Sequence, residues 1–257
     1  MLKKNYLIFI IALYFPIQLD AKVFCNICEH SAKSFGRFGV KRKPNRCCQK
    51  CSSIGRQRHL WHFLQTEKSE IFEKQLTLLH WAPDPCIRKK LEQLDNLHYI
   101  GGDIEPERWN TSNVVKMDIT NIDLPGNSID VVLCSHVMEH IVDDELAMRE
   151  VYRILKFNGY ALFMVPLFDH SLKKTYEDAT IIDPSERLKH FGQSDHVRKY
   201  VSCDFEARLV KAGFHVQAFP VKRLPKDLIT RYVMADPKEL AEKSAADIFL
   251  CTKRSII

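Results

Sequence analysis

The stretch Ser128–Ile141, SIDVVLCSHVMEHI, decides the fold. Its first half is an apolar run, which is typical of a strand buried on both faces of a parallel sheet. Its second half contains HVMEH, which fits the H-x-x-E-H pattern of zinc peptidases. A zinc peptidase needs both histidines on one face of a continuous helix, whereas this segment follows directly on a strand. We therefore expect His136 at a strand end, in a turn, and not one helical turn below His140.

Strand-like and helix-like segments alternate on both sides of this stretch. The expected strands are LTLLHWA, LHYIGGD, NVVKMDI, SIDVVLCS, YALFMVP, HVQAFPV and DIFLCTK (76–82, 97–103, 113–119, 128–135, 160–166, 215–221 and 247–253). The main helices are expected over 83–94, 143–156 and 202–214, the second of them ended by Asn158 and Gly159. This alternation predicts an α/β fold with a doubly wound, mostly parallel, seven-stranded Rossmann-like sheet. Ligands of such sheets lie beyond the carboxyl ends of the strands.

Two C-x-x-C pairs precede this domain. Cys25 and Cys28 form the first pair, and Cys48 and Cys51 form the second. This spacing predicts a tetrahedral zinc site with four thiolate ligands, which folds a segment too small to build its own core. Cys47 either replaces Cys48 as a ligand or stands outside the site. Thiolates bind zinc only when reduced, so the pattern favours a cytoplasmic location.

The net charge of +6 is concentrated near these cysteines, because residues 30–66 contain nine Lys or Arg and no Asp or Glu. We expect Arg46, Lys50 and Arg56 to offset the negative charge of a four-thiolate zinc. The same block also suits contact with RNA. The helix that follows is expected to dock onto the main domain through Leu60, Trp61, Phe63 and Leu64. Arg58 and His59 are expected on its solvated basic face.

The first 21 residues resemble a secretory signal peptide, with two lysines before the apolar run 6–15. The run is too short for a stable membrane span. The segment is therefore either an export or membrane-association signal or an extension without a targeting role.

The order of these motifs resembles that of class I S-adenosylmethionine-dependent methyltransferases. The resemblance rests on an acidic end to the second strand, on MDIT, on SIDVVLCSHVMEHI followed by DD, and on the LKFNG turn, and it spans about residues 75–253. The segment FCNICE to RCCQKCSSIGRQRHLW is similar to the zinc-ribbon-like front end of a bacterial subgroup, which also shares TYED and FGQSDHVR. The implied organisation is a signal-like segment (1–21), a zinc-ribbon-like module (22–64) and a methyltransferase domain (70–257) with an acceptor-side insertion (167–201).

The resemblance implies S-adenosylmethionine as the cofactor. Asp103 would accept hydrogen bonds from the ribose hydroxyls, Asp118 and the backbone of Ile119 would receive the adenine, and Ser135 and His136 would line the sulfonium. The full implied set is Trp81, Ala82, Pro83, Asp103, Ile104, Asp118, Ile119, Ser135 and His136. One departure concerns the first turn, HWAPDP, which lacks the glycines usual in the family.

The insertion is dense in polar and aromatic side chains, and we expect it to hold the acceptor. Asp195 and His196 are the candidate catalytic pair, with His196 preferred as a base. Candidate substrate contacts are Tyr176, Glu177, His190, Arg198 and His140. A second possibility is that Glu177, Asp178, His190 and His196 bind a metal or a hydroxylated acceptor.

The leading hypothesis is methyl transfer to a small molecule, a glycan or a lipid-linked intermediate. An RNA methyltransferase and a binding protein with a degenerate methyltransferase fold are the alternatives, and a zinc hydrolase is the least supported. The sequence does not name the methyl acceptor.

Overall fold

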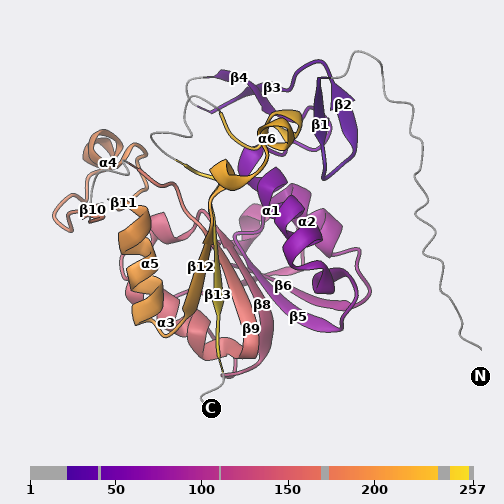
Figure 1. The fold of residues 1–257 in the computed structure, drawn as a ribbon. Coiled ribbons are helices and arrows are strands. Elements are labelled where there is room, and N and C mark those ends of the chain that lie inside the picture. The colour runs from indigo at the N-terminus through magenta and orange to yellow at the C-terminus, as the bar shows by residue number, and fades with distance from the viewer. Residues whose placement is uncertain (1–21, 40–41, 110, 169–173, 237–243, 255–257) are drawn as a thin grey trace, which may run out of the picture.

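A computed structural model describes residues 22–39, 42–109, 111–168, 174–236 and 244–254. Its centre is a seven-stranded sheet in the order β12-β13-β9-β8-β5-β6-β7 (Figure 1). The strands are β5 (Leu76–Trp81), β6 (Leu97–Asp103), β7 (Val114–Lys116), β8 (Ile129–Ser135), β9 (Leu155–Met164), β12 (His215–Phe219) and β13 (Ile248–Thr252). All neighbours are parallel except β13, which runs antiparallel to β9 and β12. The predicted mostly parallel, doubly wound sheet is confirmed.

Helices cover both faces of the sheet because the central strands are apolar on both sides. Along β8, Val131 and Leu133 belong to one buried cluster, and Val132 and Cys134 belong to the other. The first cluster lies under α1 and α2, and the second lies under α3 and α5 (Figure 1). The helices are α1 (Gly55–Glu67), α2 (Pro85–Leu91), α3 (Asp144–Ile154), α4 (Pro184–Phe191), α5 (Ser202–Lys211) and α6 (Lys226–Tyr232).

Helix α3 follows the decisive stretch directly. Asp143 caps it by accepting a hydrogen bond from the Leu146 amide at 2.9 Å. We expected this helix to reach residue 156 and to be stopped by Asn158 and Gly159. That prediction is wrong, because α3 ends at Ile154. The amide of Ser128 donates to the Ile154 carbonyl at 2.8 Å, and the next residue already begins β9.

The cysteine-bearing segment, residues 22–54, is called the cysteine module below. It contains two antiparallel hairpins, one of β1 (Val23–Cys25) with β2 (His30–Ala32) and one of β3 (Gly36–Phe38) with β4 (Lys43–Cys47). Buried residues of the module share one hydrophobic cluster with α1 and with one face of the sheet. The module therefore rests on the core of the large domain and does not build a separate one.

The insertion folds as β10 (Tyr176–Glu177), α4 and β11 (Arg198–Lys199), with β10 and β11 antiparallel. It lies at the same end of the sheet as the cysteine module (Figure 1). Short 3-10 helices are η1 (Ser69–Phe72), η2 (Pro106–Trp109), η3 (Met138–His140) and η4 (Val221–Arg223). Within the part of the chain that the structure describes, no helix has the length and apolar character needed to cross a membrane. The signal-like residues 1–21 lie outside that part.

Candidate functional site

The four cysteines predicted as metal ligands meet in one place. The Sγ atoms of Cys25 and Cys51 are 3.6 Å apart, as are those of Cys28 and Cys48. A disulfide would require about 2.05 Å. A tetrahedral zinc with bonds of about 2.3 Å has edges of about 3.8 Å, which is close to the observed separation. The donor set and its spacing therefore fit a closed zinc site.

The two C-x-x-C turns have the same geometry. Glu29 follows the first pair with φ 59° and donates its amide to the Cys25 carbonyl at 2.8 Å. Ser52 follows the second pair with φ 60° and donates to the Cys48 carbonyl at 2.8 Å. Cys47 lies outside the group of four, and its thiol contacts the Ser52 carbonyl at 3.4 Å.

The thiol pKa values within the cluster diverge. The pKa of Cys25 is lowered to about 4, chiefly by the hydrogen bond from Cys51. The pKa of Cys28 is raised to about 11, chiefly by burial. A thiolate among buried and half-buried cysteines is an arrangement that a divalent cation stabilises, because coordination deprotonates the thiols.

Arg58 is the main basic residue beside this cluster, and the expectation that it lies on a solvated face is wrong. Its side chain is fully buried. Its guanidinium donates to the carbonyls of Ser53, Arg46, Tyr232 and Val233. Burial lowers the pKa of Arg58, whereas the charges of the cysteines raise it. Arg58 precedes Trp61 by three positions on α1, which is the sequence signal for its place on the buried face.

The other expectations for the basic block have mixed outcomes. His59 is also buried, contrary to expectation, and its Nδ1 bonds to the Ala246 carbonyl. Lys50 donates to the Cys28 carbonyl at 3.2 Å, so it does lie beside the cluster. Arg46 forms an ion pair with Asp236.

The turn after β5 has the backbone shape that a glycine would favour. Ala82 has φ 40°, in the left-handed region, and its amide donates to the Gly102 carbonyl at 2.8 Å. Trp81 is buried and packs against Gly102, where an added Cβ would lie 3.2 Å from the indole ring. Pro83 is buried as well. The glycine-less first turn therefore keeps a left-handed residue at the point where the chain leaves β5.

The acidic residue at the end of β6 is buried, and each of its carboxylate oxygens already accepts one hydrogen bond. Asp103 Oδ1 accepts from the Glu105 amide at 2.9 Å, and its Oδ2 accepts from the Trp109 indole at 2.8 Å. Each carboxylate oxygen retains one further lone pair. The next residue, Ile104, is exposed.

Asp118 lies two residues beyond the end of β7 and is exposed. Its Oδ1 accepts from the amide and the hydroxyl of Thr120, at 2.8 and 2.7 Å. The neighbouring Ile119 is buried in the core. Asp118 therefore stabilises its own turn, and its role toward adenine stays a prediction.

The residues after β8 form a turn and not a helical face, as the strand context predicted. His136 has φ 57°, and the residues directly after it form only the short 3-10 helix η3. Its Nδ1 lies 3.1 Å from Glu139 Oε1, and its Nε2 lies 2.9 Å from the Ala245 carbonyl. Burial opposes ionisation of Glu139, but the charge and hydrogen bond of His136 outweigh it, and the pKa of Glu139 is lowered. The Ser135 hydroxyl is buried and has no hydrogen-bond partner among the described residues.

The candidate catalytic pair is separated in the structure. Asp195 Oδ2 lies 3.4 Å from Nδ1 of His140, and among the described residues it has no bond to His196. His196 is buried, and its ring packs edge-on against that of His140 with centroids 4.8 Å apart. Burial lowers the pKa of His196, so its imidazole is neutral near pH 7. The His196 ring therefore packs against η3, and the Asp195 carboxylate lies beside His140.

Several candidate substrate residues form hydrogen bonds and ion pairs that stabilise the insertion. Glu177 bonds to Arg198 at 2.8 Å and to Arg208 at 2.6 Å. Arg198 is buried and its remaining donors bind carbonyls of residues 138–142. Tyr176 and His190 are bonded to each other at 2.7 Å on the exposed side. The four-residue metal set expected within the insertion is therefore not assembled in the described structure.

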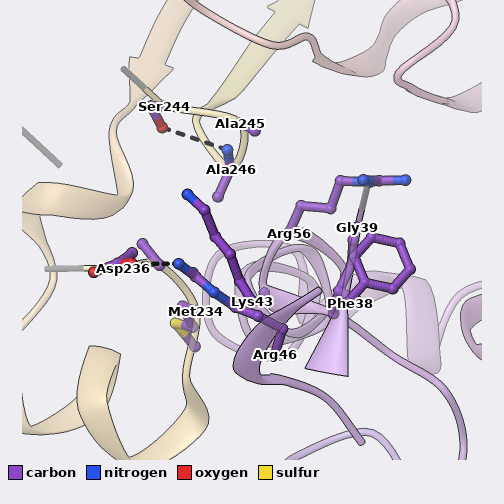
Figure 2. A pocket seen from close by; sticks show the side chains of 13 residues that line it. Phe38, Gly39, Lys43, Arg46, Arg56, Met234, Asp236, Ser244, Ala245 and Ala246 are labelled. Atoms are coloured by element: carbon purple, nitrogen blue, oxygen red, sulfur yellow. Dashed lines mark hydrogen bonds and ion pairs between the residues drawn. The ribbon is translucent and has the colours of Figure 1, made fainter. Parts of the chain in front are cut away.

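A pocket of about 260 Å³ opens between the cysteine module and the segment before β13. Figure 2 shows Lys43, Arg46 and Arg56 on one side of it, with Asp236 and Ala245 on the other. None of the described insertion residues lines it. The pocket adjoins the turn after β8, because its wall residue Ala245 bonds to His136.

Comparisons with known proteins agree with this arrangement. Residues 87–163 match the family described as a methyltransferase domain. A ubiquinone/menaquinone biosynthesis C-methyltransferase from Pasteurella multocida is 25% identical over 145 residues, which cover 51% of this chain and 50% of that protein. The chain therefore spans about half the length of this relative.

Two solved structures share the fold at low identity. An S-adenosylmethionine-dependent methyltransferase from Mesorhizobium loti is 13% identical with a TM-score of 0.53, over 76% of this chain and 98% of that one. The [4+2]-cyclase SpnF is 14% identical with a TM-score of 0.52, over 88% and 89%. Residues 87–163 are therefore similar to a methyltransferase domain, and the chain shares its fold with these two solved structures. That the cysteine module marks a zinc-bearing subgroup stays a prediction.

Proposed function

We propose that the chain transfers the methyl group of S-adenosylmethionine to a small acceptor, either a free small molecule, a glycan or a lipid-linked intermediate. The observation that carries this proposal is the carboxyl edge, by which we mean residues 81–84, 103–105 and 135–140 after β5, β6 and β8. It presents a left-handed turn, a buried carboxylate and a buried hydroxyl at successive strand ends. Ligands of such sheets bind there.

These groups fit the cofactor by their chemistry. Asp103 has a free lone pair on each oxygen for the two ribose hydroxyls, and the Ser135 hydroxyl lacks a protein partner among the described residues. S-adenosylmethionine supplies an electrophilic methyl group on its sulfonium. The task of the chain is to hold the acceptor in line with that group and to exclude water.

The pocket supports an acceptor that bears a phosphate or carboxylate. Among the described residues, Lys43, Arg46 and Arg56 line it together with one carboxylate, that of Asp236, which pairs with Arg46. Its wall bonds to His136, so an acceptor anchored there lies beside the turn after β8. A volume of about 260 Å³ suits a small group better than a nucleic-acid helix. We also propose that the four cysteines bind one structural zinc ion.

Calorimetry with S-adenosylmethionine tests cofactor binding. Asp103→Ala should weaken binding at least about tenfold, because two charge-assisted hydrogen bonds are lost. Trp109→Phe is the matched control, since it removes the indole that bonds to Asp103 but keeps the carboxylate. If the wild-type chain does not bind the cofactor at all, the degenerate-fold alternative is favoured.

Transfer of labelled methyl groups into separate metabolite, glycan and RNA pools tests the acceptor. We expect label in an anionic small molecule or glycan. Arg56→Gln should then raise the KM for the acceptor at least about tenfold, with unchanged affinity for the cofactor, because one charge-assisted bond contributes about 1.5–3 kcal/mol. Label confined to RNA, with a steep loss of binding in salt, would establish the RNA alternative.

A further inference from the structure

Three side chains from two distant segments meet beside the end of β8. Glu139 and His140 belong to η3, and His196 precedes β11. One ligand atom from each lies within 4.8 Å of the others. We propose that these three side chains bind a divalent transition-metal ion, at a site separate from the four cysteines. Bonds of about 2.0–2.2 Å hold neighbouring ligands about 3–3.5 Å apart, so small side-chain rotations would close the cluster.

Two buried atoms of this cluster point to a missing ligand. Glu139 is 1% exposed and His196 is 2% exposed. Among the described residues, Glu139 Oε2 and His196 Nδ1 have no hydrogen-bond partner. A buried polar atom left in this way costs about 1–3 kcal/mol. A cation between the two side chains would satisfy both atoms at once.

The surroundings supply the outer partners that metal ligands usually have. Nδ1 of His136 lies 3.1 Å from Glu139 Oε1 and leaves Oε2 for a metal. Asp195 lies beside Nδ1 of His140, with its Oδ2 at 3.4 Å and its carbonyl at 3.3 Å, and leaves Nε2. A carboxylate behind a ligating histidine fixes its tautomer and its orientation.

The backbone holds the two segments together. The amide of Val197 donates to the Glu139 carbonyl at 2.9 Å. Arg198 donates to the Val142 carbonyl at 2.8 Å and to the Met138 carbonyl at 3.3 Å. The carbonyls on both sides of Glu139 and His140 are therefore tied to the segment that carries His196. Because these hydrogen bonds hold the two segments together, the ligands are positioned before the ion binds.

The ligand set also indicates what the site can do. Two imidazoles and one carboxylate suit zinc, cobalt, manganese or iron, and three protein ligands leave a coordination position open. His136 joins Glu139 to Ala245 in the wall of the cationic pocket. The open position therefore suits an oxygen atom of an acceptor anchored in that pocket. This last role rests on the proposed methyl transfer, whereas metal binding does not.

Titration of the full chain with Co²⁺, followed by absorption and by metal analysis, tests the site. The cysteine site should give intense near-ultraviolet thiolate bands, and the second site should give only weak visible bands. We expect the wild-type chain to bind two ions and His196→Ala to bind one, with the thiolate bands intact. His190→Ala is the matched control, because this histidine lies in the same insertion but bonds to Tyr176.

Intact thiolate bands show that each variant is folded around its cysteine site. Glu139→Gln provides a near-isosteric second variant, which should weaken the second site at least about tenfold. The proposal is overturned if the wild-type chain binds no ion beyond the one that gives thiolate bands, or if His196→Ala and Glu139→Gln bind as many ions as the wild-type chain. Calorimetry with S-adenosylmethionine is unaffected by that result, so failure of this site is distinguishable from failure of the proposed methyl transfer.

Discussion

The four-cysteine cluster and the cluster of Glu139, His140 and His196 differ in how the chain assembles them. The cysteines lie in two like turns of one short segment, and four donors leave no position open. The second cluster joins segments more than fifty residues apart and offers three donors. The contrast indicates that a closed set of ligands holds structure, whereas an open set beside a pocket can hold a substrate. It also predicts that replacements at the two clusters have different consequences.

The largest effect is expected at the closed cluster. Cys48→Ser removes one of the four proposed zinc ligands at a buried position, so the chain should lose one zinc per molecule and several kcal/mol of stability. Metal analysis and urea unfolding measure the two losses.

Cys47→Ser is the matched control, because Cys47 is adjacent in sequence but lies outside the four. It should keep the zinc and change the stability by less than about 1 kcal/mol. If Cys47→Ser loses the metal and Cys48→Ser keeps it, the ligand assignment is wrong.

The second effect concerns the connection of the cysteine module to the rest of the chain. Arg58→Met should cost about 3–5 kcal/mol, because it leaves several buried carbonyls without a donor. Urea unfolding followed by far-ultraviolet circular dichroism measures this loss. Arg149→Met removes an exposed pair with Glu145 instead and should change the stability by less than about 0.5 kcal/mol. Equal losses in the two variants would mean that Arg58 does not secure the module.

A third effect depends on pH and involves His59, which ties α1 to Ala246. Burial lowers the pKa of His59 to about 4, whereas the pKa of a histidine in an unfolded chain is about 6.5. Below pH 6.5 His59 is therefore protonated in the unfolded chain and stays neutral in the folded chain. As a result, the free energy of unfolding falls as the pH drops toward 4. The contribution between pH 7 and pH 5 is about 2 kcal/mol.

His59→Gln removes this titration and can still donate to the Ala246 carbonyl. Urea unfolding at pH 7 and pH 5 should therefore show a smaller acid loss for His59→Gln than for the wild-type chain. Loss of metal from the cysteines at low pH is common to both proteins and cancels in the difference. Identical acid losses would show that His59 does not titrate in this way.

The sequence was sufficient for features that depend on local pattern. Alternating apolar strands predicted the sheet, and the spacing of the cysteines predicted their cluster. The strand before His136 correctly argued against a helical HVMEH site. The spacing of Arg58 from Trp61 could have placed it on the buried face of α1. Its bonds to the carbonyls of Tyr232 and Val233 and the meeting of His140 with His196 depend on how distant segments pack, and no local pattern contains that information. The pairing of Asp195 with His140 was missed for the same reason, because adjacency in sequence suggested His196.

The smallest effect is expected at the first turn of the carboxyl edge, and its sign is opposite to the others. Ala82 has φ 40°, where a side chain is strained and glycine is not. Ala82→Gly should therefore raise the stability by about 1 kcal/mol. Ala207→Gly, at an exposed position within α5, is the same chemical change in a helical backbone and should lower the stability by about 1 kcal/mol. Urea unfolding of the two variants compares them directly. If both lose stability, the turn after β5 is not left-handed in solution, and the cofactor-side geometry built on it fails.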